Sequence, residues 1–157
     1  MAVTIRRGEP RDATAIAEFN RRMAWETEHK HLDPNVLARG VGRVFADPAR
    51  GFYLIAEADG EVVGQLMVTF EWSDWRDGWF WWVQSVYVRA DARGRGVYRT
   101  LYEHVRERAR AAGDVIGLRL YVEKDNHAAR ETYHRLGMEA IHFDLMQELL
   151  RPLETTS

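Results

Sequence analysis

The chain has 157 residues, no cysteine and a formal net charge of −2, which excludes disulfides, thiolate catalysis and zinc–thiolate sites and argues against a general nucleic-acid binder. Apolar residues make up 46% and charged residues 29% of the chain, as in globular proteins, and the length suits one domain with a sizeable core. We expect a soluble, cytoplasmic protein, because no apolar run reaches membrane-spanning length and the N-terminus lacks the apolar segment of a signal peptide.

The N-terminal third of the chain predicts a short strand followed by two helices. The alternation around Val3 and Ile5 indicates the strand. Asp12 can cap the first helix, whose apolar side recurs at helical spacing: Ile16, Phe19 and Met23. The second helix begins at Asp33-Pro34, an N-cap followed by proline at the first helical position, and ends before Asp47-Pro48.

Three strands are predicted next. Residues 52–58 and 62–70 are joined by Asp59-Gly60, which is a strong signal for an antiparallel hairpin. Gly64 interrupts the second of these strands and indicates a bulge or a close backbone contact. A polar link leads to the third strand, residues 79–88, which is mostly apolar, aromatic and β-branched.

A glycine-spaced loop follows this strand, and a helix from Val97 to near Gly113 follows the loop. The run consists of Arg93, Gly94, Arg95, Gly96, Val97 and Tyr98. The order strand, loop, helix aims backbone N–H groups and the positive end of a helix dipole at one point. The glycines permit positive φ and the arginines add charge. The sequence therefore predicts an anion site, with a flexible, solvated basic loop as the plainer alternative.

The remaining elements complete a mixed sheet. Residues 115–123 alternate as a strand, residues 126–136 form a short helix closed by Gly137, and residues 138–149 are strand-like. Strands joined by helical crossovers are parallel neighbours, and hairpin strands are antiparallel. The expected fold class is α/β (α+β): a mixed, mainly antiparallel central sheet flanked by helices. We expect a single domain over residues 1–150 and a C-terminal tail, residues 151–157.

The loop lacks residues that two common phosphate-binding motifs require, and this limits which anion it could bind. A Walker loop ends in Gly-Lys-Ser/Thr, which is not present, and a dinucleotide fingerprint has a third glycine where this chain has Arg99. The run instead resembles the pyrophosphate loop of the GNAT superfamily of acyl-CoA-dependent N-acyltransferases, Gln/Arg-x-x-Gly-x-Gly/Ala. This pattern maps onto Arg93, Gly96 and Tyr98. Tyr98 departs from it, because the last position is normally tiny.

Other segments are similar to GNAT motifs in the correct order, over nearly the whole chain. They are Ile5-Arg6 with Asp12, Asp59-Gly60-x-Val62-Val63-Gly64, Asn126-x-x-Ala129-x-x-x-Tyr133 and Tyr133-x-x-Leu136-Gly137-Met138. One departure lies at the C-terminus, where the family commonly has two strands and only a dozen or so sheet-like residues follow Gly137. A missing strand would leave an open sheet edge, which allows strand exchange or a homodimer.

The resemblance implies acetyl-CoA as co-substrate, no metal, and a primary amine as acceptor. It implies that the loop from Arg93 to Tyr98 binds the pyrophosphate and that backbone groups of Val86 and Val88 bind the pantetheine arm. It further implies that Asn126 and Tyr133 contact the cofactor and that Tyr133 is the general acid for the departing thiolate. The plainer alternatives are that Tyr133 packs on the sheet and that Asn126 is a helix N-cap, a role that is compatible with a cofactor contact.

A base is also needed, because an alkylamine is mostly protonated at pH 7 and only its neutral form attacks. Many relatives place a glutamate on the strand before the loop, where this chain has Trp82 and Gln84. The base must therefore lie elsewhere, with Glu71 the first candidate and Asp74 the second, or a water chain must carry the proton. The alternative reading of both carboxylates is that they are solvated loop residues. Two histidines that could accept a proton are better explained as surface or hairpin residues: His127 and His142.

The acceptor is suggested by two groups of residues. Five tryptophans surround one hairpin: Trp72, Trp75, Trp79, Trp81 and Trp82. They indicate either a packed sheet end or an aromatic wall that binds a cation. Acidic residues in segments flanking the acceptor side in this fold favour a cationic acceptor: Glu26, Glu28, Asp33, Glu71, Asp74 and Asp77.

The resulting hypothesis is an N-acetyltransferase that transfers an acetyl group from acetyl-CoA to the primary amine of a small cationic molecule or a protein. The alternative is a non-catalytic acyl-CoA-binding sensor or regulatory module, because Trp82 and Gln84 stand where a base is expected. A third reading, an RNA-binding domain that uses the basic loop and tryptophan stacking, is disfavoured by the net charge of −2.

Overall fold

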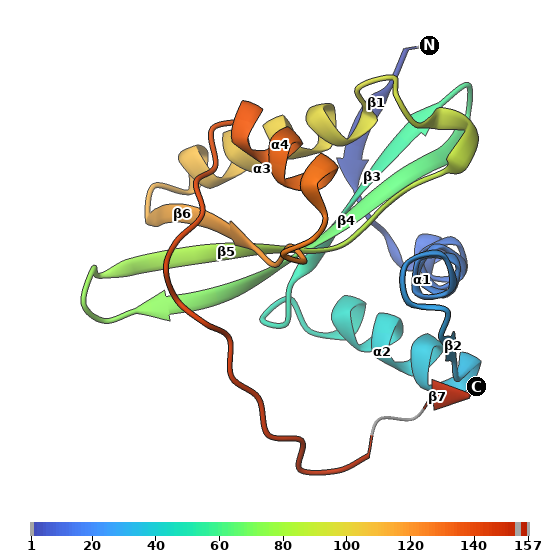
Figure 1. Cartoon of the computed structure of the whole chain (residues 1–157). Coiled ribbons are helices and arrows are strands. Elements are labelled where there is room, and N and C mark those ends of the chain that lie inside the picture. The colour runs from blue at the N-terminus through green and yellow to red at the C-terminus, as the bar shows by residue number, and fades with distance from the viewer. Residues whose placement is uncertain (1, 153–154, 157) are drawn as a thin grey trace. The chain divides into compact units, whose positions relative to one another are not determined.

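The computed structural model describes residues 2–152 and 155–156. The chain forms two compact units, residues 1–120 with 155–157, and residues 121–154. The elements of the first unit are labelled in Figure 1 and are, in chain order, β1 (Thr4–Arg7), α1 (Ala13–Glu28), β2 (His31–Leu32), α2 (Pro34–Ala46), β3 (Phe52–Ala58), β4 (Glu61–Ser73), β5 (Gly78–Val88), α3 (Val97–Ala112), β6 (Val115–Leu120) and β7 (Thr155–Thr156). The second unit holds α4 (His127–Arg135).

The first unit is built on a five-stranded sheet in the order β1-β3-β4-β5-β6. β5 and β6 are parallel, and the other neighbouring pairs are antiparallel. This confirms the mixed, mainly antiparallel sheet, with the parallel pair at the helical crossover through α3. β2 and β7 form a separate two-stranded sheet.

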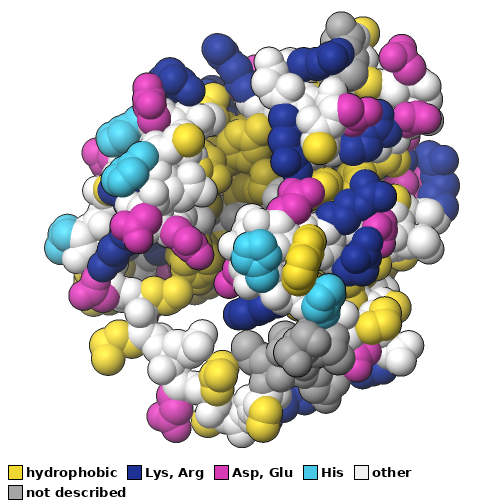
Figure 2. Space-filling view, turned by 45° about the vertical axis from the view of Figure 1, so that its right-hand side comes forward, with side chains coloured by type: hydrophobic (Ala, Val, Ile, Leu, Met, Phe, Trp, Pro, Cys, Tyr) yellow, Lys and Arg dark blue, Asp and Glu magenta, His cyan; other side chains and the backbone are white. Residues whose placement is uncertain are grey.

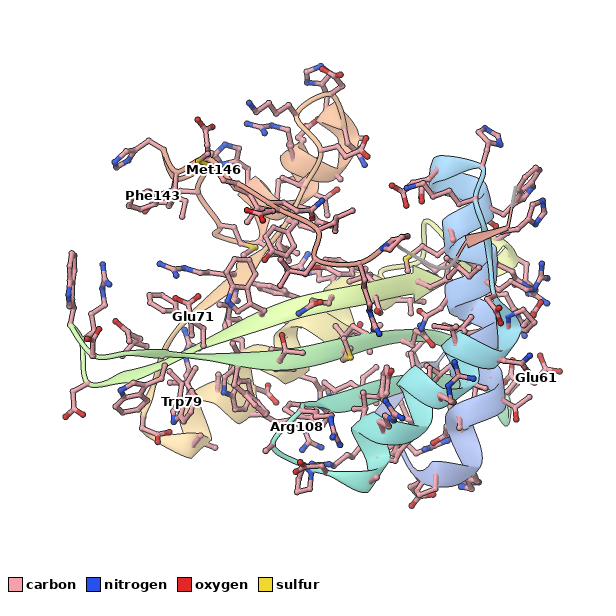
Figure 3. The ribbon with its side chains drawn as sticks, turned by 90° about the horizontal axis from the view of Figure 1, so that it is seen from below. Glu61, Glu71, Trp79, Arg108, Phe143 and Met146 are labelled. Atoms are coloured by element: carbon pink, nitrogen blue, oxygen red, sulfur yellow. The ribbon has the colours of Figure 1, made fainter. Side chains whose placement is uncertain are left out.

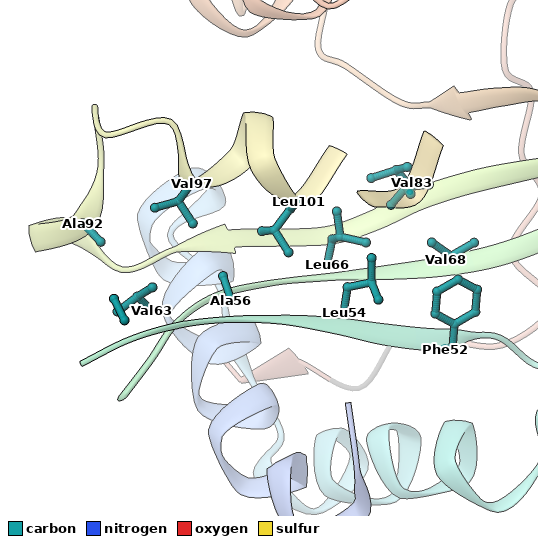
Figure 4. Packing of buried hydrophobic residues seen from close by; sticks show 12 residues of the cluster. Phe52, Leu54, Ala56, Val63, Leu66, Val68, Val83, Ala92, Val97 and Leu101 are labelled. Carbon is teal, nitrogen blue, oxygen red and sulfur yellow. The ribbon is translucent and has the colours of Figure 1, made fainter. Parts of the chain in front are cut away.

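Helices cover both faces of this sheet (Figure 1). Leu54 and Leu66 of the central strands pack with Leu101 of α3 on one face (Figure 4). On the other face, Ile55 packs with residues of α1 and α2, namely Ile16 and Val41. Because successive residues of a strand point to opposite faces, β3 is buried on both sides and reads as an almost continuous apolar run.

Local sequence signals set several element ends as predicted. Asp33 accepts hydrogen bonds from the N–H groups of the first turn of α2, and Gly113 closes α3 with φ +85°. Asp12 is the N-cap residue of α1, as predicted, but its side chain makes no capping bond to that helix. Its carboxylate instead accepts from Arg6 at 2.7 and 2.8 Å and from the N–H of Glu9 at 2.7 Å. Bonds between charged groups are the stronger ones, and they take this side chain away from the helix.

Near the C-terminus, the predicted strand over residues 138–149 is wrong. This segment has neither helix nor strand, and the strand expected over residues 115–123 ends at Leu120. A strand needs a neighbouring backbone for its hydrogen bonds, and an apolar alternation does not supply one. The apolar side chains of Phe143 and Met146 are exposed and project from the segment (Figure 3). Among the residues that the structure describes, no helix is long and apolar enough to span a bilayer.

Candidate functional site

The glycine loop leads from β5 into the amino end of α3. Gly94 and Gly96 both have φ +77°, a left-handed conformation that favours glycine. Gly96 is the N-cap residue of α3 and provides no side-chain hydrogen bond to it. A Cβ atom added at either glycine would meet no other atom within 4 Å. Backbone conformation, not crowding, is therefore what requires glycine here. The amino end of α3 consequently presents backbone N–H groups and the positive end of a helix dipole.

The two arginines of the loop differ in their surroundings. Arg95 is exposed and makes no ion pair with the described part of the chain. The guanidinium of Arg93 is held by Glu26 of α1, with Nη2 2.7 Å from Oε2, and its Nε donates to the carbonyl of Val88 at 2.8 Å. The hydroxyl of Tyr87 donates to the other carboxylate oxygen of Glu26 at 3.0 Å.

These contacts shift two pKa values in opposite directions. The hydrogen bond from Arg93 lowers the pKa of Glu26, and the bond from Tyr87 adds to that effect. Burial raises the pKa of Tyr87, and its hydrogen bond to Glu26 adds to that rise. Glu26 is thus an ionised partner of Arg93 and is already engaged inside the first unit.

β5 contains a bulge in its second half, before the glycine loop. Gln65 and Met67 of β4 pair with Tyr87 and Gln84 of β5, so β5 has one more residue than β4 in this interval. Ser85 within the bulge has φ +50°, a conformation that is uncommon for a residue other than glycine.

A buried amide supports this bulge. The side-chain nitrogen of Gln65 donates to the carbonyl of Ser85 at 3.2 Å and to Oδ1 of Asn20, on α1, at 2.9 Å. Both amide side chains are buried. A carbonyl that has left the regular ladder therefore receives a side-chain partner, as a buried carbonyl requires.

Beyond the bulge, one edge of β5 is unpaired in the described part of the sheet. β6 pairs only with residues 79–83 of β5. The N–H of Arg89 donates to the carbonyl of Val63 on the β4 side at 2.8 Å. Because neighbouring residues of a strand direct their backbone groups to opposite edges, those of Val88 point away from β4. By the same alternation with Tyr87, so do those of Val86. The structure thus brings both predicted backbone contacts to the edge next to the glycine loop.

Glu71, the predicted base, lies close to the turn between β4 and β5, at the opposite end of β4 from Glu61 (Figure 3). Oε1 of Glu71 accepts a hydrogen bond from the indole N–H of Trp82 at 2.8 Å, and Arg119 of β6 lies 3.1 Å from the same oxygen. The guanidinium of Arg119 also stacks on the ring of Phe80 at 3.5 Å. Gln84, the other residue at the usual base position, donates to the hydroxyl of Thr69.

The tryptophans do not form one wall. Trp81 and Phe70 pack against the core under α3 with Phe52, and Trp79 contacts Phe70 and Trp72 at ring distances of 6.3 and 4.9 Å. Only Trp82 contacts Glu71, on the opposite face, because strand side chains alternate. Trp79 and Trp81 therefore serve as packing, whereas Trp72 and Trp75 are exposed.

The acidic residues do not form one patch either. Asp74 and Asp77 lie in the turn between β4 and β5, whereas Glu26 is bound to Arg93 beyond the far end of β5. Asp33 is engaged as the N-cap of α2. Figure 2 shows acidic side chains interspersed among basic ones on the face in view. Of the acidic residues that suggested a cationic acceptor, Glu71 and its surroundings are therefore the part of that argument that remains.

In the second unit, Asn126 is the N-cap of α4, and its side chain accepts from the N–H of Ala129 at 3.1 Å. The capping interpretation of Asn126 is therefore confirmed. Tyr133 lies on α4 and is half-buried, and its carbonyl accepts from the N–H of Met138 at 3.0 Å. Its proposed role as the acid stays a prediction. His127 and His142 are exposed, as expected of surface residues.

Several residues of the site were not singled out from the sequence: Asn20, Gln65, Phe80 and Arg119. A signal existed for Arg119, since the alternation in residues 115–123 places it on the face opposite Leu118. No signal existed for Gln65, because nothing local in a sequence shows where a partner strand will bulge. Among the described residues, no group of three or more His, Asp or Glu side chains could hold a metal ion.

Comparison with known proteins gives a consistent family. A family model described as "Acetyltransferase (GNAT) family" matches residues 12–138. Mycothiol acetyltransferase from Mycolicibacterium gilvum is 30% identical over 148 residues, which are 91% of this chain and 47% of that relative. The chain thus spans about half the length of the curated relatives it matches.

Solved structures agree with this family. The crystal structure of a possible acetyltransferase from Clostridium difficile 630 is 37% identical, has a TM-score of 0.89, and covers 97% of this chain and 100% of that one. The crystal structure of a "predicted acetyltransferase with acetyl-CoA" from Clostridium acetobutylicum has a TM-score of 0.77 at 16% identity and covers 95% of this chain and 97% of that one. The second likeness shows the fold alone.

Proposed function

The chain belongs to the GNAT acetyltransferase family, and we propose that it transfers an acetyl group from acetyl-CoA to the primary amine of a small cationic molecule or a protein. One observation carries this proposal: the uncapped amino end of α3 closely follows the unpaired edge of β5. A diphosphate and an amide-bearing arm can be bound side by side at such a place.

The glycine loop fits the diphosphate. The positive φ of Gly94 and Gly96, and the absence of neighbouring atoms over both, let a ligand approach the backbone closely. Backbone N–H groups at a helix amino end bind phosphate oxygens, and the helix dipole favours the negative charge. Arg95 is exposed and makes no ion pair with the described residues, so it adds a positive charge to the site.

The edge of β5 fits the pantetheine arm. An extended chain of amides can add to an open sheet edge as an extra strand, through N–H and C=O groups of that edge. Val86 and Val88 offer these groups on the side away from β4. An N–H group of the same edge can also polarise a thioester carbonyl and stabilise the oxyanion that forms there.

Acetyl-CoA supplies the activated acetyl group, and side chains of this chain handle the protons. We propose that Tyr133 gives a proton to the departing sulfur, as its match to the family motif implies. Glu71 is the proposed base for the amine, with its carboxylate oriented by Trp82 and Arg119. The acceptor amine would then bind on the face of the hairpin that carries Glu71.

The curated relatives favour a small-molecule acceptor, since they are named mycothiol acetyltransferases. The polar and aromatic surroundings of Glu71 fit a small polar amine. A protein amine remains within the proposal, because the chain matches only about half of each relative.

The test is calorimetric titration with CoA, followed by a thiol-release assay with acetyl-CoA and a panel of amines: a polyamine, an aminoglycoside, amino acids and a peptide with a free N-terminus. We expect CoA binding and turnover with at least one small polar amine. Absence of CoA binding would remove the proposed function.

A second function is favoured by one observation. Both residues at the usual base position are engaged elsewhere, Trp82 with Glu71 and Gln84 with Thr69. This favours a non-catalytic acyl-CoA sensor or regulatory module. Tight CoA binding with no transfer to any amine would support the sensor over the enzyme.

We also propose a homodimer. β6 ends the five-strand order of the sheet, and its outer edge pairs with no strand among the described residues. Open edges favour pairing with another chain. Light scattering coupled to gel filtration should give twice the mass of 18.3 kDa, and a monomer at all accessible concentrations would contradict this part.

A further inference from the structure

Arg93 has contacts that a phosphate ligand would not need. Its guanidinium is bound to Glu26 at 2.7 Å and to the carbonyl of Val88 at 2.8 Å, and it stacks on the ring of Tyr87 at 5.3 Å from the ring centre. Tyr87 itself donates to Glu26 at 3.0 Å. Four groups from α1, β5 and the first position of the loop are therefore linked at one place.

These contacts tie the start of the loop to the edge that follows the bulge. The N–H of Arg93 also donates to the carbonyl of Ala90 at 3.4 Å, so backbone and side chain of this residue are both engaged. The positive charge of Arg93 is balanced by Glu26. Arg95, two residues later, has no such partner among the described residues. The two arginines of the loop thus have different tasks.

We propose that Glu26 and Arg93 are positioning residues of the acetyl-CoA site: Glu26 holds the Arg93 side chain on the carbonyl of Val88, and this fixes the amino end of α3 relative to the open edge of β5. This inference rests on the proposed function and adds to it a role for the last part of α1. Arg95 is then the arginine whose charge acts on the anion.

Glu26 could act through its charge or by positioning the loop, and the two explanations predict opposite effects of its removal on the affinity for CoA. If Glu26 acted only through its charge, its removal would strengthen the binding of an anion such as CoA, because like charges repel. If Glu26 positions the loop, its removal weakens that binding. The side chains of Glu26 and Arg93 are 40% and 47% exposed, so the pair contributes little to folding stability, and the melting temperature should hardly move.

The experiment is calorimetric titration of the full chain with CoA. Glu26→Gln should raise the Kd for CoA about three- to tenfold, as expected for loss of a charge-assisted hydrogen bond that orders a binding loop. The matched control is Glu28→Gln, which removes the same charge from the same helix; its carboxylate contacts Lys30 at 3.7 Å. This control should bind CoA like the wild type. Tighter or unchanged binding by Glu26→Gln would overturn the proposal.

Two further arms separate positioning from charge. Glu26→Gln should add nothing in an Arg93→Gln background, because Glu26 acts through Arg93, and additive effects would overturn the proposal. Arg95→Gln should weaken CoA binding mostly at low salt, whereas the loss in Glu26→Gln should persist at high salt, because screening removes only the charge effect. If the wild type fails to bind CoA, the proposed function falls and this inference with it. If only the Glu26 and Arg93 results fail, the proposed function stands.

Discussion

Replacing Gly96 by alanine separates folding from binding at the glycine loop. Gly96 has φ +77° and ψ 16°, where a residue with a Cβ atom is strained by roughly 1–2 kcal/mol. The added Cβ meets no atom of the chain within 4 Å, so no clash adds to that strain. We expect the free energy of unfolding to fall by about 1 kcal/mol and the melting temperature by about 2–4 °C. The same methyl group would lie at the amino end of α3 and keep a phosphate from its N–H groups, raising the Kd for CoA by at least about tenfold.

Gly113→Ala is the matched control at the other end of α3. Gly113 has φ +85°, and a Cβ there also meets no atom within 4 Å. Its effect on stability should equal that of Gly96→Ala, because the strain is the same. Thermal denaturation measures the first quantity, and calorimetric titration with CoA measures the second. Equal CoA affinity in the two variants, with equal loss of stability, would refute the placement of the pyrophosphate at Gly96.

Three further predictions concern single side chains. Tyr133→Phe should lower kcat at least about tenfold while leaving KM for acetyl-CoA little changed; a wild-type rate would remove Tyr133 as the acid. Glu71→Gln should lower kcat and leave Arg119 without its ion pair, with CoA affinity unchanged in titration; unaltered turnover would send the search for a base to Asp74. Arg6 lowers the pKa of Asp12, so the stability from this pair is present above the ordinary Asp pKa and is lost as pH falls through the lowered value. Asp12→Asn should therefore cost about 2 kcal/mol at pH 7, and denaturant titrations should show the difference from the wild type shrinking as the pH falls below the ordinary Asp pKa; a difference that is constant with pH would contradict this reasoning.

Much of the fold could be predicted because its signals are local. Asp33-Pro34 starts α2, Asp59-Gly60 joins β3 to β4, and Gly113 ends α3, as the sequence indicates. Each depends on one or two residues whose backbone preference or side-chain bond acts within a few positions. The glycine loop was predictable for the same reason, since strand, loop and helix are consecutive in the chain.

The C-terminal segment could not be predicted in this way. Ile141, Phe143 and Leu145 alternate as a strand would, yet all three are exposed and the segment is irregular. Alternation says which side chains could share a face, but not whether a neighbouring strand is available to pair with the segment. The missing information is the identity of the pairing edge, which lies far away in the sequence or in another chain.

The bulge in β5 explains why the site itself was predicted only in part. Before it, Trp81 and Val83 face the core under α3, whereas Trp82 faces Glu71. In an unbroken strand, side chains would continue to alternate between the two faces of the sheet, and Tyr87 would lie under α3. The extra residue in the bulge exchanges the two faces for the residues that follow it. Tyr87 therefore packs on Phe19 of α1 at 4.9 Å between ring centres and reaches Glu26. This exchange also places the side chains of Val86 and Val88 against the α3 core. One inserted residue, which a period-two pattern in the sequence does not show, thus turns Tyr87 toward α1 and creates its contact with Glu26.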